Sequence, residues 1–156
     1  FGLPAQGEPA ARAGMRISRR FLTMDGQALN LDTLRQGQVF LLVVEARAET
    51  GETHRAMIQQ GLPAGWEIQS RLPPGEPPGQ GFLGELSDAE AFPALDDRFA
   101  AAADFTPARQ LLRYAVRVRA VTAGSFELPG AEVVDMYRPG IFARQGPARI
   151  TMRPAE

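Results

Sequence analysis

The sequence contains no cysteine and no lysine, and each absence excludes a kind of chemistry. Without cysteine the chain has no disulfide, no thiol nucleophile, no thiolate metal ligand and no site for lipid attachment through Cys. Without lysine all 17 basic residues are arginines, so every side-chain cation is a planar fork that stays charged. A GC-rich genome is the ordinary explanation of such an arginine bias.

Long apolar runs and a strong net charge are also lacking. No hydrophobic stretch approaches the length of a membrane span. The formal net charge of −1 gives no electrostatic footprint for nucleic acid. The chain begins at Phe1 rather than Met and shows no signal peptide, so we expect a mature form or an excised domain of a longer protein.

What is present suits one globular domain. The chain has 156 residues, of which 44% are hydrophobic and 22% are charged. These values are ordinary, and a chain of this size can bury about two-thirds of its unfolded surface. Residues 1–14 are rich in Gly, Pro and Ala with little periodicity, so they are predicted to be a linker that leads into a domain at residues 15–156.

Period-two alternation of apolar and polar residues dominates this domain and predicts β-strands. The clearest strand is 111–121, where apolar side chains face one way and Arg113, Arg117 and Arg119 face the other. Strand 39–49 is apolar on both faces in its first half, which predicts that this half is covered on both sides. Further short strands are expected at 15–23, 54–60, 99–105, 125–128, 133–137, 141–144 and 149–153.

Many short strands with almost no helical period are typical of an antiparallel β-sandwich. The predicted fold class is therefore all-β, of the fibronectin III or immunoglobulin kind, with at most one short helix at Asp88–Phe92. Ser87 and Glu90 fit a capping box at the start of that helix. The Pro- and Gly-rich stretch 71–81 is expected to be an exposed loop, and Trp66 a core aromatic at a strand start.

No residue pattern nominates a catalytic or metal site. His54 is the single histidine, and it is predicted to be exposed at a strand start, because no signal supplies a nucleophile or an orienting acid for it. Asp88, Glu90, Asp96 and Asp97 match no calcium-loop spacing and are expected to form a solvated turn. We therefore expect no catalytic residue, no metal and no cofactor, and the chain is predicted not to be an enzyme.

Two further patterns have simple explanations. The stretch 79–84 matches G-x-G-x-x-G, but a Pro-rich loop precedes it and no long helix can follow, so no dinucleotide site is expected. The face formed by Arg113, Arg117 and Arg119 is predicted to be the solvated side of an antiparallel sheet. The alternative is that this basic face meets an acidic neighbour.

The segment 128–139 carries Met136 and Tyr137 side by side, between Pro129-Gly130 and Pro139-Gly140. Pro and Gly pairs mark turns and stiffen the chain around them. A large apolar pair in such a place has two possible uses. Either it packs into the core of this domain, or it is held outward to cover another surface.

Four blocks resemble, in order and spacing, the C-terminal domain of bacterial α2-macroglobulins: Leu62–Ile68, Asp96–Phe99, Tyr114–Thr122 and Leu128–Pro139. The resemblance covers residues 15–153 and implies a macroglobulin-like β-sandwich. It also implies a long, multidomain periplasmic parent from a Gram-negative bacterium, in which a protease cuts a bait region and is trapped. Many members hold an internal thioester of the Cys-Gly-Glu-Gln type. A chain without cysteine cannot carry it, so the thioester would lie in another domain.

In thioester-bearing members a loop of the last macroglobulin-like domain covers the thioester before activation. The shielding residues of the family correspond to Met136, Tyr137 and Pro139 in this sequence, and with Arg138 they form the predicted interdomain contact site. A flat aromatic ring and a flexible thioether suit a water-excluding cover. The function implied is that of a non-catalytic domain of a protease inhibitor, which shields the thioester until bait cleavage.

The same resemblance implies the partners. They are the thioester domain and other macroglobulin-like domains of the same chain, and the parent as a whole meets the target proteases. We expect this segment neither to bind nucleic acid nor to insert into a membrane. The rival hypothesis is a ligand-binding or adhesion β-sandwich module of a cell-envelope protein. Such a module would need an exposed aromatic platform, whereas Trp66, Tyr114 and Tyr137 are scattered along the sequence.

Overall fold

A computed structural model describes residues 11–31, 34–72, 75, 86–89 and 98–154. Every helix-or-strand element among these residues is a β-strand, and the all-β prediction is confirmed. Asp88 and Ala89, at the start of the short helix expected from the sequence, are not helical, and the rest of that stretch lies outside the described residues. The described residues contain no helix with the length and hydropathy needed to cross a bilayer.

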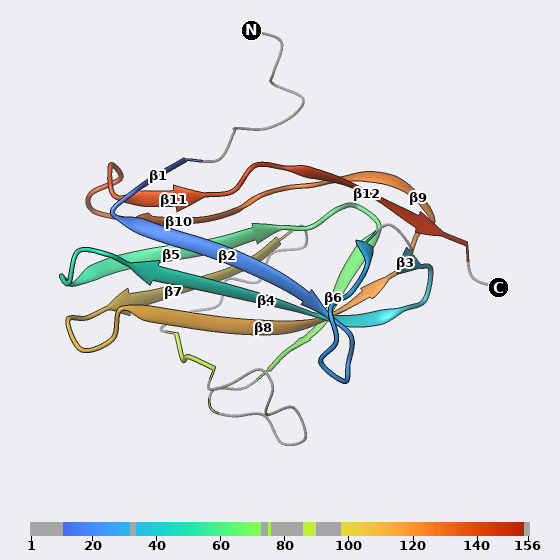
Figure 1. Cartoon of the computed structure of the whole chain (residues 1–156), viewed down its shortest axis with the longest axis horizontal. Helices are drawn as coiled ribbons and strands as arrows, with labels where there is room; N and C mark the ends of the chain where they lie inside the picture. The colour runs from blue at the N-terminus through green and yellow to red at the C-terminus, as the bar shows by residue number, and fades with distance from the viewer. Residues whose placement is uncertain (1–10, 32–33, 73–74, 76–85, 90–97, 155–156) are drawn as a thin grey trace, which may run out of the picture.

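Two sheets face each other to form the sandwich, and a smaller sheet extends it at one end (Figure 1). The five-stranded sheet has the order β1-β11-β10-β5-β7, the four-stranded sheet β2-β4-β8-β6, and the small sheet β3-β12-β9. Neighbouring strands are antiparallel except β3 and β12. The strands are β1 (Ala11–Ala13), β2 (Met15–Leu22), β3 (Leu34–Arg35), β4 (Val39–Ala48), β5 (His54–Gly61), β6 (Trp66–Arg71), β7 (Arg98–Phe105), β8 (Leu111–Ala120), β9 (Gly124–Leu128), β10 (Ala131–Asp135), β11 (Phe142–Arg144) and β12 (Ala148–Arg153).

The core lies between the two large sheets, and alternation along β4 and β8 supplies one side of it. These strands pair in register from Val39 opposite Arg119 to Arg47 opposite Leu111. Their inward side chains are buried: Phe40, Leu42, Val44, Ala46, Leu112, Tyr114, Val116 and Val118. Complete burial of one large apolar side chain stabilises the fold by about 1.5–3 kcal/mol, so this face is a major source of stability.

The outer face of β4 is also covered over its first half, as the sequence predicts. Leu41 and Val43 point away from the main core yet are fully buried. They form a second apolar cluster with Leu22, Leu86 and Ala115. This cluster explains why the first half of β4 is a continuous apolar run, whereas apolar and polar residues alternate in its second half.

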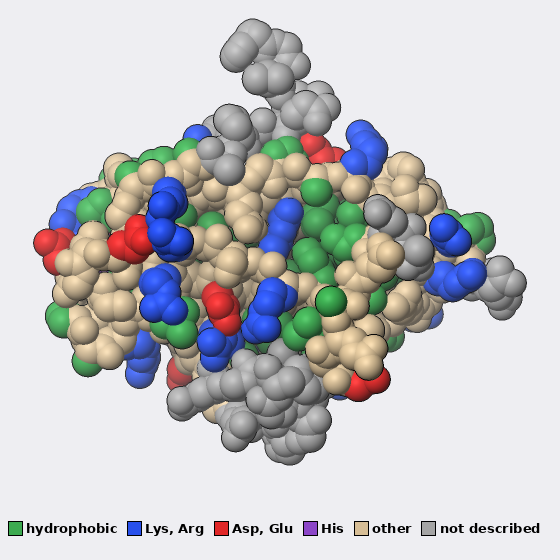
Figure 2. Space-filling view, viewed as in Figure 1, with side chains coloured by type: hydrophobic (Ala, Val, Ile, Leu, Met, Phe, Trp, Pro, Cys, Tyr) green, Lys and Arg blue, Asp and Glu red, His purple; other side chains and the backbone are tan. Residues whose placement is uncertain are grey.

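The basic face of β8 is less solvated than predicted. Arg119 is exposed, but Arg113 and Arg117 are only half-exposed. Arg113 pairs with Glu45, its cross-strand neighbour on β4, so part of its charge is neutralised by the adjacent strand. Figure 2 shows such acidic and basic side chains next to each other on the visible face of the molecule.

Residues 11–13 lie within the stretch predicted to be a linker, but they form β1 and pair with β11. The chain then crosses from the five-stranded sheet to β2 of the other sheet at Gly14. Gly14 has a φ of 82°, a conformation that only glycine adopts readily. The sandwich therefore includes Ala11–Ala13, which the sequence assigned to the linker.

Candidate functional site

Three loops meet at one end of the sandwich, at the left of Figure 1. They connect β4 to β5, β7 to β8 and β10 to β11. The amide of Gly51, in the first loop, donates to Gln110 Oε1 of the second across 2.9 Å. The guanidinium of Arg138, in the third loop, donates to the carbonyl oxygen of Thr53 across 3.3 Å. The three loops therefore form one connected surface.

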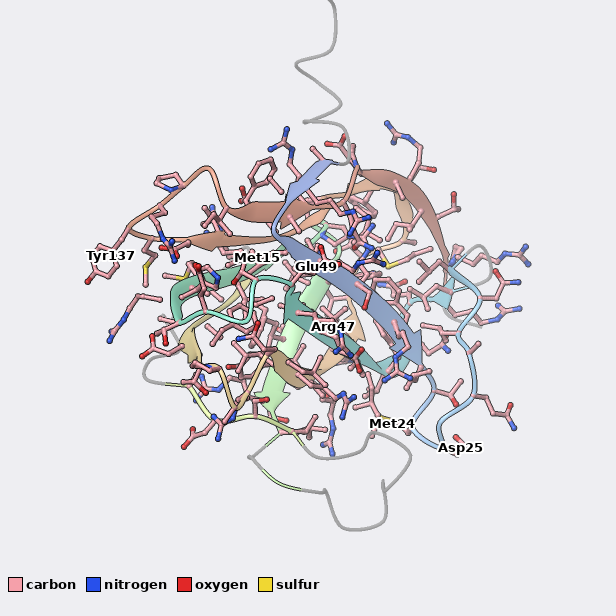
Figure 3. The ribbon with its side chains drawn as sticks, turned by 60° about the vertical axis from the view of Figure 1, so that its left-hand side comes forward. Met15, Met24, Asp25, Arg47, Glu49 and Tyr137 are labelled. Carbon is pink, nitrogen blue, oxygen red and sulfur yellow. The ribbon has the colours of Figure 1, made fainter. Side chains whose placement is uncertain are left out.

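Met136 and Tyr137 are exposed on this surface. Their exposed fractions are 40% and 79%, and they are the exposed large hydrophobic side chains among the residues that the structure describes. Figure 3 shows Tyr137 projecting from the end of the molecule. The sequence predicts a strand through Tyr137, but β10 ends at Asp135, so both side chains lie on the loop instead. Of the two possible uses of this pair, packing in the domain's own core is excluded.

Backbone hydrogen bonds close the β10–β11 loop. The amide of Asp135 donates to the carbonyl of Ile141 across 3.0 Å, and the amide of Ile141 donates to the carbonyl of Arg138 across 2.9 Å. The amide of Met136 donates to the carbonyl of Arg55 on β5 across 2.8 Å. The loop is therefore joined at its base to the neighbouring strand, while Pro139 stays exposed at its tip.

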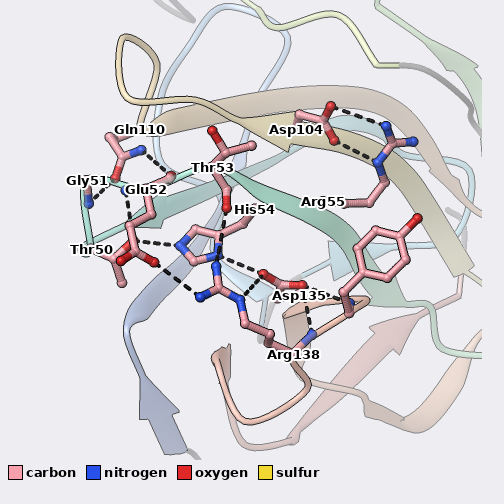
Figure 4. A network of polar contacts seen from close by, with 11 residues as sticks. Thr50, Gly51, Glu52, Thr53, His54, Arg55, Asp104, Gln110, Asp135 and Arg138 are labelled. Atoms are coloured by element: carbon pink, nitrogen blue, oxygen red, sulfur yellow. Dashed lines mark hydrogen bonds and ion pairs between the residues drawn. The ribbon is translucent and has the colours of Figure 1, made fainter.

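A buried carboxylate organises this loop from beneath (Figure 4). Asp135 is 2% exposed, and its Oδ1 accepts hydrogen bonds from the amides of Tyr137 at 2.8 Å and Arg138 at 3.0 Å. Its Oδ2 lies 2.7 Å from His54 Nδ1. Burial alone would raise the pKa of Asp135, but hydrogen bonds from His54 and from the two amides outweigh burial and hold the pKa below its ordinary value.

The sequence-based prediction that His54 is exposed is wrong. His54 is 1% exposed at the start of β5, and its Nε2 lies 2.6 Å from Thr50 Oγ1. Arg138 covers the ring from the solvent side, with Nη2 3.1 Å from His54 Nδ1 and Nε 3.5 Å from Asp135 Oδ2. The prediction failed because Asp135 is 81 residues away in sequence, so no local pattern announces a partner for the imidazole.

Thr50, His54 and Asp135 have the connectivity of a hydroxyl–imidazole–carboxylate triad, which sequence reasoning did not find. A hydrolytic triad also requires free donors for the developing oxyanion. The two amides that follow Thr50 in the chain are engaged: Gly51 donates to Gln110 Oε1 and Glu52 donates to Thr50 Oγ1 itself. This arrangement suits a structural network better than an acyl-transfer site.

A hollow of about 280 Å³ lies beside Tyr137. The ion pair of Arg55 Nε with Asp104 Oδ1, at 3.0 Å, forms part of its wall. Thr53, Asp135 and Arg138 also line it. The exposed ring therefore stands next to a polar depression, and a partner surface that covers the ring also meets these charges.

The other candidate motifs do not join this site. Within the described ranges, no three His, Cys, Asp or Glu side chains come together as a metal site. Asp88 is exposed, whereas Glu90, Asp96, Asp97 and the glycine-rich stretch 79–84 lie outside the described residues. Trp66 is buried at the start of β6, as predicted.

Comparison with known proteins identifies the fold and the family. Residues 14–140 match the family described as Bacterial Alpha-2-macroglobulin MG10 domain. The chain belongs to this family. It is 31% identical over 165 residues to an alpha-2-macroglobulin of Xylella fastidiosa strain Temecula1, a match that covers 97% of this chain and 10% of that protein. This MG10 domain therefore spans about a tenth of the length of the curated relatives that it matches.

Solved structures of alpha-2-macroglobulins have the same fold. The crystal structure of the Salmonella protein reacted with methylamine matches this MG10 domain with a TM-score of 0.81 and 27% identity, over 97% of this chain and 10% of that chain. A structure of the native Escherichia coli protein, spanning domain MG7 to the C-terminus, matches with a TM-score of 0.78 and 25% identity, over 97% of this chain and 25% of that chain.

Proposed function

We propose that this MG10 domain is a non-catalytic domain of a bacterial alpha-2-macroglobulin, and that its β10–β11 loop covers a thioester held in another domain of the same protein. In this proposal the parent is a periplasmic protease inhibitor of a Gram-negative bacterium, and this domain stands at its C-terminus. The cover is released when a target protease cuts the bait region. The observation that carries the proposal is the exposure of Met136 and Tyr137 on a loop whose base is closed by backbone hydrogen bonds.

The chemistry of the loop supports this role. A thioester persists only where water and amines are excluded, and an aromatic ring with a thioether gives a large apolar contact area. Tyr137, at 79% exposed, makes little contact with its own domain and is available to a partner. Pro139 restricts the backbone at the tip, which lowers the entropy lost when the loop docks.

The test compares a full-length alpha-2-macroglobulin carrying this domain with its Tyr137→Gly variant. Free thiol released by methylamine is followed over time in the native protein. We expect faster release from Tyr137→Gly, because loss of the ring opens a path for the nucleophile without changing the thioester bond. Tyr137→Phe, which keeps the ring, is the matched control and should release thiol at about the wild-type rate.

Thermal unfolding of the isolated chain accompanies this test. Because Tyr137 is exposed, Tyr137→Gly should change the stability of the domain by about 0.5 kcal/mol or less. Equal rates of thiol release in wild type and Tyr137→Gly would exclude the shielding role. The non-catalytic part of the proposal is checked separately, since the isolated chain should hydrolyse neither peptide nor ester substrates.

A further inference from the structure

The exposed conformation of Tyr137 has a definable origin within the domain. Residues 136–140 are all exposed, so burial of their side chains does not hold them in place. Such a loop is normally the least ordered part of a sandwich, because little apolar contact opposes its conformational entropy. In this domain the amides of Tyr137 and Arg138 both donate to Asp135 Oδ1 instead. One buried oxygen therefore sets the backbone of the two residues at the centre of the contact site.

The second oxygen of the same carboxylate is fixed by His54. A carboxylate oxygen lies 2.7 Å from His54 Nδ1 and pairs with that nitrogen when it carries a proton, so Nδ1 donates to Asp135 Oδ2. Arg138 Nη2, 3.1 Å from the same nitrogen, is then a packing contact and not a hydrogen bond, because a guanidinium cannot accept. In the neutral ring Nε2 then accepts from the hydroxyl of Thr50 at 2.6 Å, and Thr50 Oγ1 accepts from the amide of Glu52 at 3.1 Å. A continuous chain of hydrogen bonds thus runs from the β4–β5 loop to the β10–β11 loop.

Arg138 closes the network on the solvent side. Its guanidinium contacts Glu52 Oε1 at 3.2 Å and the carbonyl of Thr53 at 3.3 Å, and its Nε lies 3.5 Å from Asp135 Oδ2. The contacts with Glu52 are exposed and therefore weak, whereas those of Asp135 and His54 are shielded from water. The buried pair, rather than the outer arginine, is the part of the network that can fix the loop.

We propose that the buried Asp135–His54 pair is the positioning element that holds Tyr137 outward in a preset conformation. Its use in shielding rests on the function proposed above, but the positioning itself is a property of this domain alone. A preset loop docks with a smaller loss of entropy than a mobile one, so the pair strengthens interdomain contact without touching the partner. His54 and Asp135 are positioning residues, since they act through the backbone of Tyr137 and Arg138.

The test measures amide hydrogen exchange at single residues in the ¹⁵N-labelled 156-residue chain. Asp135→Asn replaces one of the two carboxylate oxygens by an NH₂ group. If the NH₂ group faces His54, it lies opposite the N–H of Nδ1; if it faces the loop, the amides of Tyr137 and Arg138 lose their acceptor. His54→Ala removes the donor to Asp135. We expect both variants to raise the exchange rates of the Tyr137 and Arg138 amides about tenfold or more, since each bond to the carboxylate is charge-assisted.

Two controls separate positioning from general destabilisation. Val116→Ala lowers global stability through the core, on the opposite sheet, and should leave exchange at Tyr137 and Arg138 close to wild type. His54→Asn carries an N–H donor at the position of Nδ1 and should restore slow exchange to within about threefold of wild type. If Asp135→Asn and His54→Ala accelerate these two amides no more than Val116→Ala does, the positioning proposal is overturned.

Thiol release from the full-length protein then separates the two proposals. Faster exchange together with faster thiol release in Asp135→Asn supports both. Faster exchange with unchanged release in both Asp135→Asn and Tyr137→Gly supports the positioning role and overturns the shielding function. Unchanged exchange overturns the positioning role, while the comparison of Tyr137→Gly with wild type still decides whether the loop shields.

Discussion

The indole N–H of Trp66 donates a hydrogen bond to the sulfur of Met152, with 3.2 Å between Nε1 and Sδ. Trp66 begins β6 of the four-stranded sheet and Met152 lies on β12 of the small sheet, so this bond joins the two. Both side chains are buried, and no water can replace the sulfur as acceptor without opening the core. This bond is a specific polar contact between the small sheet and the sandwich within an apolar region.

Replacing Met152 by leucine tests this contact. Leucine has nearly the same volume, so the change should mainly remove the acceptor of the indole N–H. Because sulfur is a weak acceptor, we expect a loss of about 1 kcal/mol in the free energy of unfolding, measured by urea denaturation. The double variant with Trp66→Phe should show that the two losses are not additive. Additive losses would mean that the bond contributes nothing to stability.

Val116→Ala tests the assignment of the faces of β8. Val116 is buried in the main core, and the change should lower the free energy of unfolding by about 1–3 kcal/mol through lost burial and a residual cavity. Arg119, three residues further on the same strand, is exposed, and Arg119→Ala should change the free energy of unfolding by less than about 0.5 kcal/mol. Urea melts of the two variants that gave the opposite order would reverse the assignment of the faces.

Gly130, just before β10, and Gly140, in the β10–β11 loop, should respond oppositely to alanine. A Cβ atom at Gly130 would lie 1.7 Å from the carbonyl oxygen of Gln145, so Gly130→Ala forces the backbone of two adjacent segments apart. We expect it to cost about 3 kcal/mol, as in severe overpacking. Gly140 has open space around it and no positive φ, so Gly140→Ala should be neutral or stabilise by up to about 1 kcal/mol. Thermal unfolding of both variants decides this.

Asp135 should make the stability of the domain sensitive to acid. Its pKa is lowered in the folded state, so the stabilisation it provides is present above the unfolded-state pKa of about 4 and is lost as pH falls through the lower folded-state pKa. Unfolding measured between pH 7 and pH 2 should therefore show a steeper loss below about pH 4 in wild type than in Asp135→Asn. Parallel curves for the two proteins would contradict the shift.

The alternation of side chains was sufficient to predict most strands, because each strand buries one face and the pattern is local. Leu112, Tyr114, Val116 and Val118 lie in the core as their spacing predicts. The first half of β4 is buried on both faces for the reason its composition suggests. β1 was missed, since three residues between small neighbours offer no period to detect.

The candidate site was only half visible in the sequence. Its exposed half, Met136 and Tyr137, could be found from the Pro-Gly pairs around it and from the family resemblance. Its buried half depends on His54 meeting Asp135 across 81 residues, and that pairing is set by the register of β5 with β10. A local signal did exist for Asp135, because an aspartate at the end of a strand commonly accepts from amides two and three residues ahead.

The cation beside Tyr137 is a guanidinium, which determines whether the loop itself could react with a thioester that it covers. An amine at position 138 would be a potential nucleophile, and amines attack thioesters. Arg138 stays protonated at physiological pH and is engaged by Asp135, Glu52 and Thr53, so it brings positive charge to the tip without a reactive nitrogen. Since the chain contains no lysine, no other side chain brings a primary amine to the surface either. In the proposed role, the domain can lie against an acyl donor without becoming the acceptor.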